Sequence, residues 1–344
     1  MIPIQNVYYM LTYAFKVLNE DGYKNVSTEQ FHNVADLCSS ILCRGVQLQI
    51  KKGLGQDYVE ETETLSGIRG KINLAESIKT QSMQRKQLVC TYDEYSVNTY
   101  KNRIIKTTMI KLLHVDIDKK RKKEIKKLLV FFDGVDEIDV FSINWKQQYS
   151  KNDMTYRMLI SICNLIIKGL LQTTSNGSVR MMDFIDEQRM CRLYEKFILE
   201  YYRKEHPDIK ANASQIPWQL DDDFSNMLPV MQTDIMLTKD EKVLIIDAKY
   251  YKHMTQVQFD RNTIHSNNLY QIFTYVKNKE AELKETEHTV SGMLLYAKTD
   301  EGVVPHQKYK MSGNIIDIRT LDLNQNFEKI RMQLDGIVEE FFYC

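Results

Sequence analysis

Residues 230–249 read VMQTDIMLTKDEKVLIIDAK, and this stretch decides the fold. It contains two mostly apolar segments, Val230–Thr238 and Val243–Ala248, with one acid in each. The polar residues Lys239–Lys242 separate them, and two short apolar runs joined by a polar turn are typical of a β-hairpin. The sequence therefore predicts an antiparallel hairpin that carries one carboxylate in each strand.

The register of this hairpin predicts that its two acids lie together. A turn centred between Asp240 and Glu241 pairs Asp234 with Asp247, and opposed Cβ atoms in such a ladder are about 4.5–5.5 Å apart. Two carboxylates this close repel each other unless a cation lies between them, and hard divalent cations prefer oxygen ligands. Lys249 lies two residues beyond Asp247, on the same face of the strand. The pattern indicates a metal-assisted phosphodiester hydrolysis site; the alternative is an ordinary hairpin with charged ends.

A helix with two polar residues on one face follows the hairpin. Ser266–Lys277 has helical periodicity, and Gln271 and Tyr275 are four residues apart, so they share a face. Their amide and hydroxyl groups are suited to steadying a lysine, a scissile phosphate or a water molecule. The alternative is an ordinary helix surface, but the short distance in sequence from Lys249 favours a shared site.

The strand acids Asp234 and Asp247, Lys249, and the helix with Gln271 and Tyr275 together resemble the PD-(D/E)xK nuclease superfamily, in the branch that adds a Gln-x-x-x-Tyr helix. More narrowly, the chain resembles the McrC family, the nuclease subunits of McrBC modification-dependent restriction systems. The match runs nearly end to end. Short segments in the same order and spacing carry it: Ile2–Phe15, Ile68–Ile72, Asn102–Lys106, Leu193–Phe197, Thr233–Asp234, Ile246–Tyr251 and His265–Gln271.

The resemblance implies a chemistry for the predicted site. It implies that Mg²⁺ is held by Asp234 and Asp247, with the Ala248 carbonyl as a further ligand. Lys249 would orient or help to deprotonate the attacking water and would stabilise charge on the phosphate. The residues that would support this arrangement are Gln271 and Tyr275. At position 5 the chain has Gln where the family motif has Arg, which leaves the role of Gln5 open without affecting this site.

Three further features have both a functional and an ordinary structural interpretation. Glu195 lies in the first predicted helix of the second half; some related nucleases use such an acid to hold metal, and an exposed residue paired with a cation is the alternative. The run Lys119–Lys127 carries seven positive charges and one negative charge, so it suits DNA phosphates or an acidic partner, or is a solvated helix face. His265 precedes the Gln271 helix, where it orients a phosphate or is a loop or capping residue.

Composition limits the class of protein. The 344 residues carry no net charge, so any affinity for DNA comes from a local patch. Six cysteines without Cys-x-x-Cys spacing indicate reduced thiols in a cytoplasmic protein. No signal peptide opens the chain, and no apolar stretch reaches the ~18 residues of a membrane span. Gly67–Lys71 lacks the spacing of a P-loop, so nucleotide hydrolysis is expected in a separate chain.

The order of predicted elements gives an α/β fold with two domains. We expect an N-terminal mixed α+β partner-docking module over 1–165 and a PD-(D/E)xK nuclease core over 166–344, in which helices flank a mixed sheet. The best linker is Gln172–Ser178, so the fragment 175–344 is expected to fold by itself. The strands expected outside the hairpin are 46–63, 65–73, 88–95, 211–220 and 290–297. The helices expected are 7–18, 31–45, 98–113, 119–132, 154–171, 186–205, 266–280 and 325–342.

By resemblance, the first domain docks on a ring of AAA+ GTPase subunits of the McrB type and stimulates their GTP hydrolysis. The ring would supply recognition of methylated cytosine and translocation, while this chain cuts the DNA. Two alternatives remain: a non-cutting activator of an AAA+ partner whose nuclease fold is inert, and a free-standing repair nuclease of the RecB type. Intact Asp234, Asp247 and Lys249 argue against the first, and the long first domain without a motor argues against the second.

Overall fold

The computed structural model describes residues 2–20, 23, 26, 29, 31–149, 153–175, 187–222, 226–251, 255–258, 261–298 and 304–343. The chain divides into two compact units. We call Met1–Asn19 together with Ile185–Cys344 the sheet unit, and Glu20–Phe184 the helical unit. Within the described residues, none of the helices is long and apolar enough to cross a membrane.

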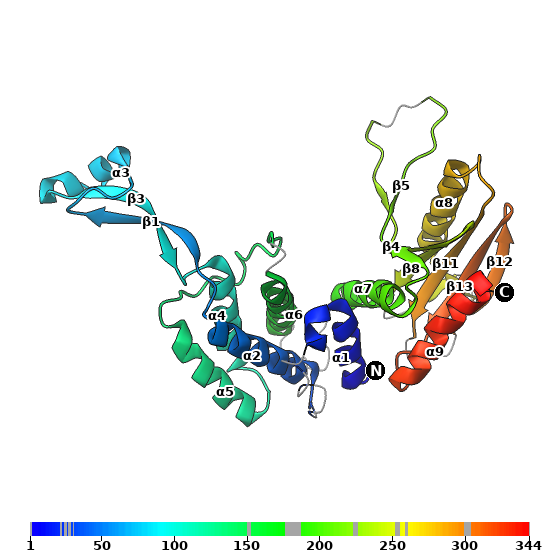
Figure 1. The fold of residues 1–344 in the computed structure, drawn as a ribbon, viewed down its shortest axis with the longest axis horizontal. Coiled ribbons are helices and arrows are strands. Elements are labelled where there is room, and N and C mark those ends of the chain that lie inside the picture. Colours follow the sequence, from blue (N-terminus) through cyan, green and yellow to red (C-terminus); the bar gives the residue numbers. More distant parts are fainter. Residues whose placement is uncertain are drawn as a thin grey trace. The chain divides into compact units, whose positions relative to one another are not determined.

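A six-stranded mixed sheet forms the centre of the sheet unit, in the order β12-β13-β11-β8-β7-β4 (Figure 1). Its strands are β4 (Lys210–Asn212), β7 (Ile235–Lys239), β8 (Lys242–Lys249), β11 (Thr289–Ala297), β12 (Gln307–Met311) and β13 (Asn314–Leu321). β8, β11 and β13 run parallel to one another, whereas β4, β7 and β12 join their neighbours antiparallel. Two short antiparallel pairs lie outside this sheet: β5 (Gln215–Ile216) with β6 (Met231–Gln232), and β9 (Thr255–Gln258) with β10 (Arg261–Ile264).

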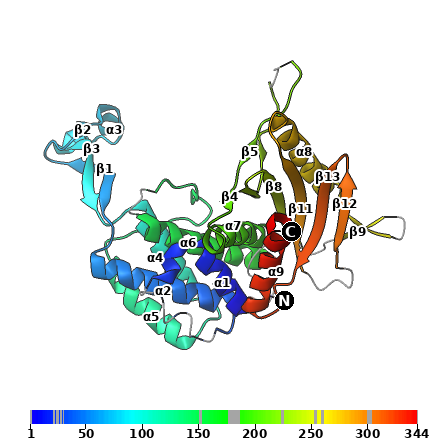
Figure 2. The same ribbon diagram turned by 45° about the vertical axis from the view of Figure 1, so that its right-hand side comes forward.

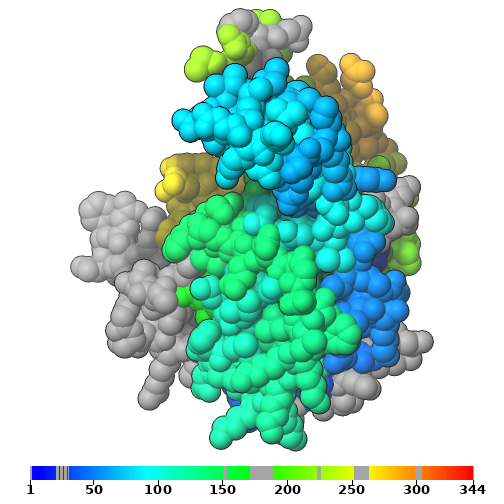
Figure 3. Space-filling view, turned by 90° about the vertical axis from the view of Figure 1, so that its left-hand side faces the viewer, coloured from blue at the N-terminus to red at the C-terminus, as the bar shows by residue number. Residues whose placement is uncertain are grey.

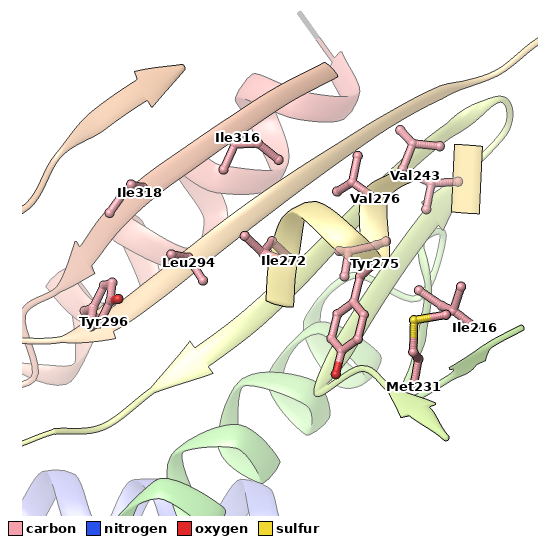
Figure 4. Close-up of a cluster of buried hydrophobic side chains, with 12 residues drawn as sticks. Ile216, Met231, Val243, Ile272, Tyr275, Val276, Leu294, Tyr296, Ile316 and Ile318 are labelled. Atoms are coloured by element: carbon pink, nitrogen blue, oxygen red, sulfur yellow. The ribbon is translucent and has the colours of Figure 1, made fainter. Parts of the chain in front are cut away.

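Helices cover both faces of the sheet, so the predicted mixed sheet flanked by helices is confirmed. On one face, α8 (Ser266–Glu282) packs into a buried apolar cluster with side chains of β8, β11 and β13 (Figure 4). On the other face lie α7 (Glu187–Glu205) and α9 (Phe327–Val338). Successive side chains of β13 point to opposite faces of the sheet. Ile318 belongs to the α8 cluster, whereas Arg319 pairs with Glu340, just beyond α9. Since both faces are covered, β8 is apolar on both sides up to its acid.

The predicted hairpin is present in its predicted register, with Thr238 of β7 opposite Val243 of β8. Asp240 begins the turn with a positive φ of 51°, a conformation that Asp tolerates better than most residues. The first strand is shorter than predicted, because residues 231–232 leave it and pair with β5. The ladder therefore begins just after Asp234, which lies at a bend.

The N-terminal helix α1 (Ile4–Ala14) belongs to the sheet unit. Asn6 is buried, and its Nδ2 donates a hydrogen bond to Leu323 O at 2.8 Å. The ring of Tyr9 stacks on the ring of Phe327, with 4.4 Å between their centroids. The first helix of the chain is thus held by residues more than 300 positions later.

The predicted division into residues 1–165 and 166–344 is wrong in two respects. The first 19 residues belong to the sheet unit, because the side chains of α1 are buried on α7 and on the segment around α9. The predicted boundary also cuts through α6 (Met154–Ser175), which packs on α2 and α4 and so belongs to the helical unit. An uninterrupted helix packed along one core does not divide between two domains.

In its described part, the body of the helical unit contains α2 (Val34–Lys52), α4 (Tyr100–Leu112), α5 (Lys119–Leu129) and α6. A three-stranded sheet of β1 (Asp57–Leu65), β2 (Lys71–Ile72) and β3 (Leu88–Ser96) carries α3 (Leu74–Lys79). We call residues 57–96 the arm, because they project from the helices of this unit as a separate lobe (Figures 2 and 3). Short helical turns are η1 (Lys16–Asn19), η3 (Ser82–Arg85), η4 (Val130–Phe132) and η7 (Glu339–Tyr343).

A buried asparagine fixes the arm to the helices of its unit. Asn102 Nδ2 in α4 donates to Gly55 O at 2.9 Å and to Val97 O at 2.8 Å, and these two residues flank the arm. Tyr156 OH in α6 donates to Asn102 Oδ1 at 2.8 Å and accepts from Gly55 N at 2.9 Å. Both ends of the arm are therefore held by α4 and α6.

Three local expectations differ from the structure. The expected strand 46–63 is helical up to Lys52, because Val46 continues the buried stripe of α2; only 57–65 is extended. The expected strand 65–73 is reduced to β2, just after Gly70 with its positive φ of 65°. The β12–β13 hairpin was not predicted, although its turn residues Ser312 and Gly313 both have positive φ, as in a type I′ turn.

Candidate active site

Asp247 lies near the end of β8 with only 1% of its surface exposed. Its Oδ2 is 2.8 Å from Lys249 Nζ, and the two side chains share the predicted face of the strand. Within the described part of the chain, neither carboxylate oxygen has an aligned hydrogen-bond partner, so the contact with Lys249 is an ion pair only. Burial raises the pKa of Asp247 to about 7, although the charge of Lys249 acts in the opposite direction. Apart from this ion pair, Asp247 lacks, among the described residues, the hydrogen bonds that a buried acid normally has.

Asp234 approaches Asp247 from the neighbouring strand. Its Oδ2 accepts a hydrogen bond from Ala248 N at 2.9 Å, at the bend that precedes β7. Burial raises the pKa of Asp234, while the Ala248 N–H and the charge of Lys249 lower it. The charge of Asp234 in turn raises the pKa of Asp247. The structure thus brings the two acids together, as the hairpin register predicts.

A chain of hydrogen bonds holds Lys249 from the side of α8. Lys249 Nζ donates to Gln271 Oε1 at 3.2 Å. Gln271 Nε2 donates to Tyr275 OH at 2.9 Å, which in turn donates to Gln232 O at 3.1 Å. Tyr275 extends from α8 towards the strand that carries Met231 (Figure 4). The two helix residues selected by their spacing therefore connect the lysine to the backbone of β6.

Lys249 is held in its charged form. Burial lowers the pKa of a lysine, but the charge of Asp247, the contact with that acid and the charge of Asp234 outweigh it and raise the pKa of Lys249 above its ordinary value. A protonated amine has no lone pair with which to accept a proton. In this arrangement Lys249 supplies a fixed positive charge. This charge favours orienting a water and stabilising a phosphate over the other predicted role, which is to deprotonate the water.

Glu195 faces the same region from α7. Its Oε1 accepts a hydrogen bond from Cys191 Sγ at 3.0 Å, one helical turn earlier. Burial raises the pKa of Glu195, and so does the charge of Asp234. Cys191 was not selected from the sequence, although its spacing of four residues from Glu195 was a usable signal.

The sequence matches the model of the family described as "McrBC 5-methylcytosine restriction system component" over residues 5–297. The chain belongs to this family. A curated relative from Escherichia coli (strain K12), named "Type IV methyl-directed restriction enzyme EcoKMcrBC", is 32% identical over 347 residues, which cover 99% of this chain and 98% of the relative. The predicted relation to McrBC systems is confirmed.

Two solved structures of McrBC assemblies resemble this chain. One is a refined half-complex from a tetradecameric assembly of Thermococcus gammatolerans McrB AAA+ hexamers with bound McrC. It matches with a TM-score of 0.50 and 16% identity over 97% of this chain and 76% of that chain, which indicates a shared fold. The other, a cryo-EM structure of the Thermococcus gammatolerans McrBC complex, matches with a TM-score of 0.40 and 18% identity over 59% of this chain and 58% of that chain.

The polar groups of this McrBC-family chain fit a hard divalent cation. Both oxygens of Asp247 are buried without aligned hydrogen-bond partners in the described part of the chain, and Asp234 adds a second carboxylate beside them. No three His, Cys, Asp or Glu side chains form a metal-sized cluster anywhere in the described ranges. Mg²⁺ is commonly held by only one or two carboxylates, with waters and substrate phosphates as its other ligands. Two acids therefore suffice for this ion, and metal ligation by Glu195 stays a prediction.

A second polar chain, missed by the sequence analysis, lies close to the site. Tyr251 OH donates to Asn268 Oδ1 at 3.3 Å, and Asn268 Nδ2 donates to Tyr296 OH at 3.0 Å. Burial raises the pKa of Tyr296 to about 12, and the charges of Asp247 and Lys249 reach this hydroxyl. The predicted His265 lies directly before α8, where its ring is 5.6 Å from that of Tyr251.

Proposed function

We propose that this chain is the Mg²⁺-dependent endonuclease subunit of a GTP-dependent restriction complex that cuts DNA containing methylcytosine. The observation that carries the proposal is the buried Asp247 carboxylate, which has no aligned hydrogen-bond partner among the described residues and lies 2.8 Å from a charged Lys249. Burying a carboxylate whose oxygens lack aligned hydrogen bonds is costly, so its presence beside a second acid and a fixed lysine supports a site built for a metal and a phosphate.

Each residue then has a definite role. Asp234, Asp247 and the Ala248 carbonyl would hold Mg²⁺, which when bound polarises a phosphoryl oxygen and lowers the pKa of a water ligand. Lys249 places its charge where negative charge develops on the phosphate and orients the attacking water. The residues that fix the lysine are Gln271 and Tyr275, through the hydrogen bonds that end at Gln232 O.

The helical unit is the proposed docking module for an AAA+ GTPase ring. The related Thermococcus gammatolerans structure contains McrB AAA+ hexamers with bound McrC, and we extend that kind of partner to this chain. The arm supports the extension because it exposes large apolar side chains, and exposed apolar groups on a projecting lobe are typical of a protein interface. These side chains are Tyr58, Ile68, Leu74, Ile78, Met83 and Tyr95. Docking there would stimulate GTP hydrolysis by the ring, in the cytoplasm.

Cleavage of supercoiled methylated plasmid tests the proposed function. The reactions contain Mg²⁺ and either this chain alone, the chain with a McrB-type GTPase and GTP, or the same pair with a non-hydrolysable GTP analogue. We expect cutting only with the GTPase and GTP, and none with Asp247→Asn in place of the natural chain. The matched control is Glu241→Gln, which neutralises an exposed acid in the turn of the same hairpin.

The same reactions separate the alternative functions. A chain that stimulates GTP hydrolysis but never cuts, with or without Asp247→Asn, would be a non-cutting activator. Robust cutting by the chain alone would indicate an autonomous nuclease. Unmethylated plasmid provides the specificity control in each reaction.

A further inference from the structure

Helix α5 of the helical unit has a buried face and a strongly basic exposed face. Ile125 and Leu128 are buried, and they point towards the helices of the same unit. Arg121 also turns inward, where it pairs with Glu29 at 2.5 Å and with Glu124 at 2.6 Å. The exposed side is formed by lysines that we call the lysine face: Lys119, Lys120, Lys123, Lys126 and Lys127.

The lysines of this face form no salt bridge with any residue that the structure describes. The one acid of the helix, Glu124, is used by Arg121 and by Gln47 Nε2. In the part of the chain that the structure describes, no carboxylate forms an ion pair with any of the five lysines. Acids flank the helix at both ends, Asp116 and Asp118 before it and Asp133 and Asp136 after it, so they limit the patch to α5 itself.

This arrangement works against the stability of the helix. The N-cap Asp118 accepts a hydrogen bond from Lys120 N at 2.6 Å and offsets part of this cost. The first turn itself has no acid, and it places two lysines at the positive end of the helix dipole. Lys119 with Lys123, and Lys123 with Lys127, are like charges four residues apart, which destabilise a helix by about 0.2–0.5 kcal/mol per pair. The whole chain carries no net charge, so a basic composition does not account for the patch. An external polyanion would remove this repulsion.

We propose that the lysine face of α5 binds the phosphate backbone of duplex DNA without reading its sequence. This inference rests on the proposed function, because a nuclease subunit needs DNA beside it, and outside residues 119–127 the chain has six more acidic than basic residues. Helix geometry places Lys119 and Lys127 about 12 Å apart along the axis, and duplex DNA carries one charge per ~1.7 Å. Several phosphates are therefore within reach of one face, and flexible lysines bind phosphates as point charges rather than through base edges.

Fluorescence anisotropy with a labelled unmodified duplex tests this binding without requiring cleavage. Every protein carries Asp247→Asn, so the measurement is independent of whether the hairpin site cuts DNA. The test variant changes all five lysines of the face to Gln. The matched control changes five exposed lysines outside α5 to Gln: Lys71, Lys79, Lys86, Lys284 and Lys310. A third variant changes the lysine face to Arg, which keeps its charge.

We expect the Gln face variant to bind DNA at least about tenfold more weakly at low salt, with a salt slope that falls by about 1 for each phosphate it no longer neutralises. The Arg variant and the scattered control should bind like the parent, and circular dichroism should show the same helix content in all proteins. Equal affinity and equal salt slope for the parent and the Gln face variant would overturn the proposal. So would competition by polyglutamate as effective as unlabelled DNA at equal charge, because the face would then fit an acidic protein.

Discussion

Lys249 Nζ donates a hydrogen bond to Gln271 Oε1 across 3.2 Å, which couples the end of β8 to the first turns of α8. The same lysine pairs with Asp247 at 2.8 Å, so the amide supplies its second contact. A lysine with one partner can rotate, whereas two partners from different elements fix the position of its charge. The position of α8 on the sheet therefore sets where the charge of Lys249 lies.

Gln271→Ala should lower cleavage about 10- to 100-fold, the usual cost of losing a group that orients a catalytic one. Its effect should fall on the rate of cutting at saturating DNA, with Mg²⁺ affinity little changed, because Asp234 and Asp247 are untouched. Single-turnover cleavage with the partner and GTP measures the rate, and isothermal calorimetry measures Mg²⁺ binding. Tyr275→Phe removes only the hydroxyl that connects Gln271 to Gln232 O and should cost less. A Gln271→Ala protein with unchanged cutting would show that Lys249 needs no such support.

Asp247→Asn should stabilise the metal-free protein while abolishing cleavage. The natural carboxylate is buried beside Asp234, whose charge raises the pKa of Asp247. A neutral amide removes the repulsion between the two acids and the desolvation of one charge, while the charge of Asp234 still acts on Lys249. Thermal unfolding at neutral pH in a chelator should show a higher Tm for the variant than for the natural chain. Added Mg²⁺ should raise the Tm of the natural chain and leave that of Asp247→Asn unchanged.

The exposed-acid variant Glu241→Gln is the control for this comparison. Its Tm should match the natural chain with and without Mg²⁺. A natural chain that is insensitive to Mg²⁺, or an Asp247→Asn protein that is less stable in the chelator, would contradict a carboxylate held for metal binding.

Gly292→Ala should disturb the site through packing. A Cβ at this position of β11 would lie 2.8 Å from both Ile272 Cγ1 and Val276 Cγ2 of α8, so these branched side chains or the helix that carries them must shift. Overpacking of this kind costs about 1–3 kcal/mol, and cleavage should fall because Gln271 moves with its neighbour Ile272. Chemical denaturation and the plasmid assay measure the two effects.

Gly336→Ala is the matched control, because its Cβ would meet nothing within 4 Å in the interior of α9. This change should stabilise the protein by about 0.5–1 kcal/mol through helix propensity. If Gly292→Ala behaves in the same way, the α8–sheet contact is less tightly packed than the structure indicates.

The parts of the site that depend on local periodicity could be predicted from the sequence. The turn after Lys239 fixes the register that brings Asp234 to Asp247, and the alternation of β8 places Lys249 beside Asp247. A spacing of four residues placed Gln271 and Tyr275 on one helix face. The contact between that face and Lys249 depends on how α8 crosses the sheet, so spacing alone could only suggest it. The resemblance to a known family supplied the connection.

The parts that escaped prediction depend on partners distant in sequence. Val46 continues a helix because its side chain is buried, although the local pattern resembles a strand. Asn268 and Tyr296 meet across α8 and β11, and neither has a distinctive local pattern. The assignment of α1 to the sheet unit rests on Leu323 and Phe327, which no periodicity in α1 could reveal.

The expectation that residues 175–344 fold alone has to be replaced, because that fragment lacks α1. Removal of α1 would expose Phe197 and Phe327, which pack on Tyr13, and would leave the Leu323 carbonyl without its donor. We predict that residues 185–344 melt at a lower temperature than the same segment fused after residues 1–19 through a long flexible Gly/Ser linker. Circular dichroism melting compares the two proteins.

Asn6→Ala in the fused protein separates the specific contact from a general effect of added chain. Asn6 Nδ2 donates to Leu323 O at 2.8 Å and to Gln325 O at 2.6 Å, so its loss leaves two carbonyls without this donor and should cost about 1–3 kcal/mol. The fused protein with Asn6→Ala should therefore melt between the other two. If residues 185–344 alone unfold as cooperatively and at the same temperature as the fused protein, α1 is an accessory to the sheet unit and not part of its core.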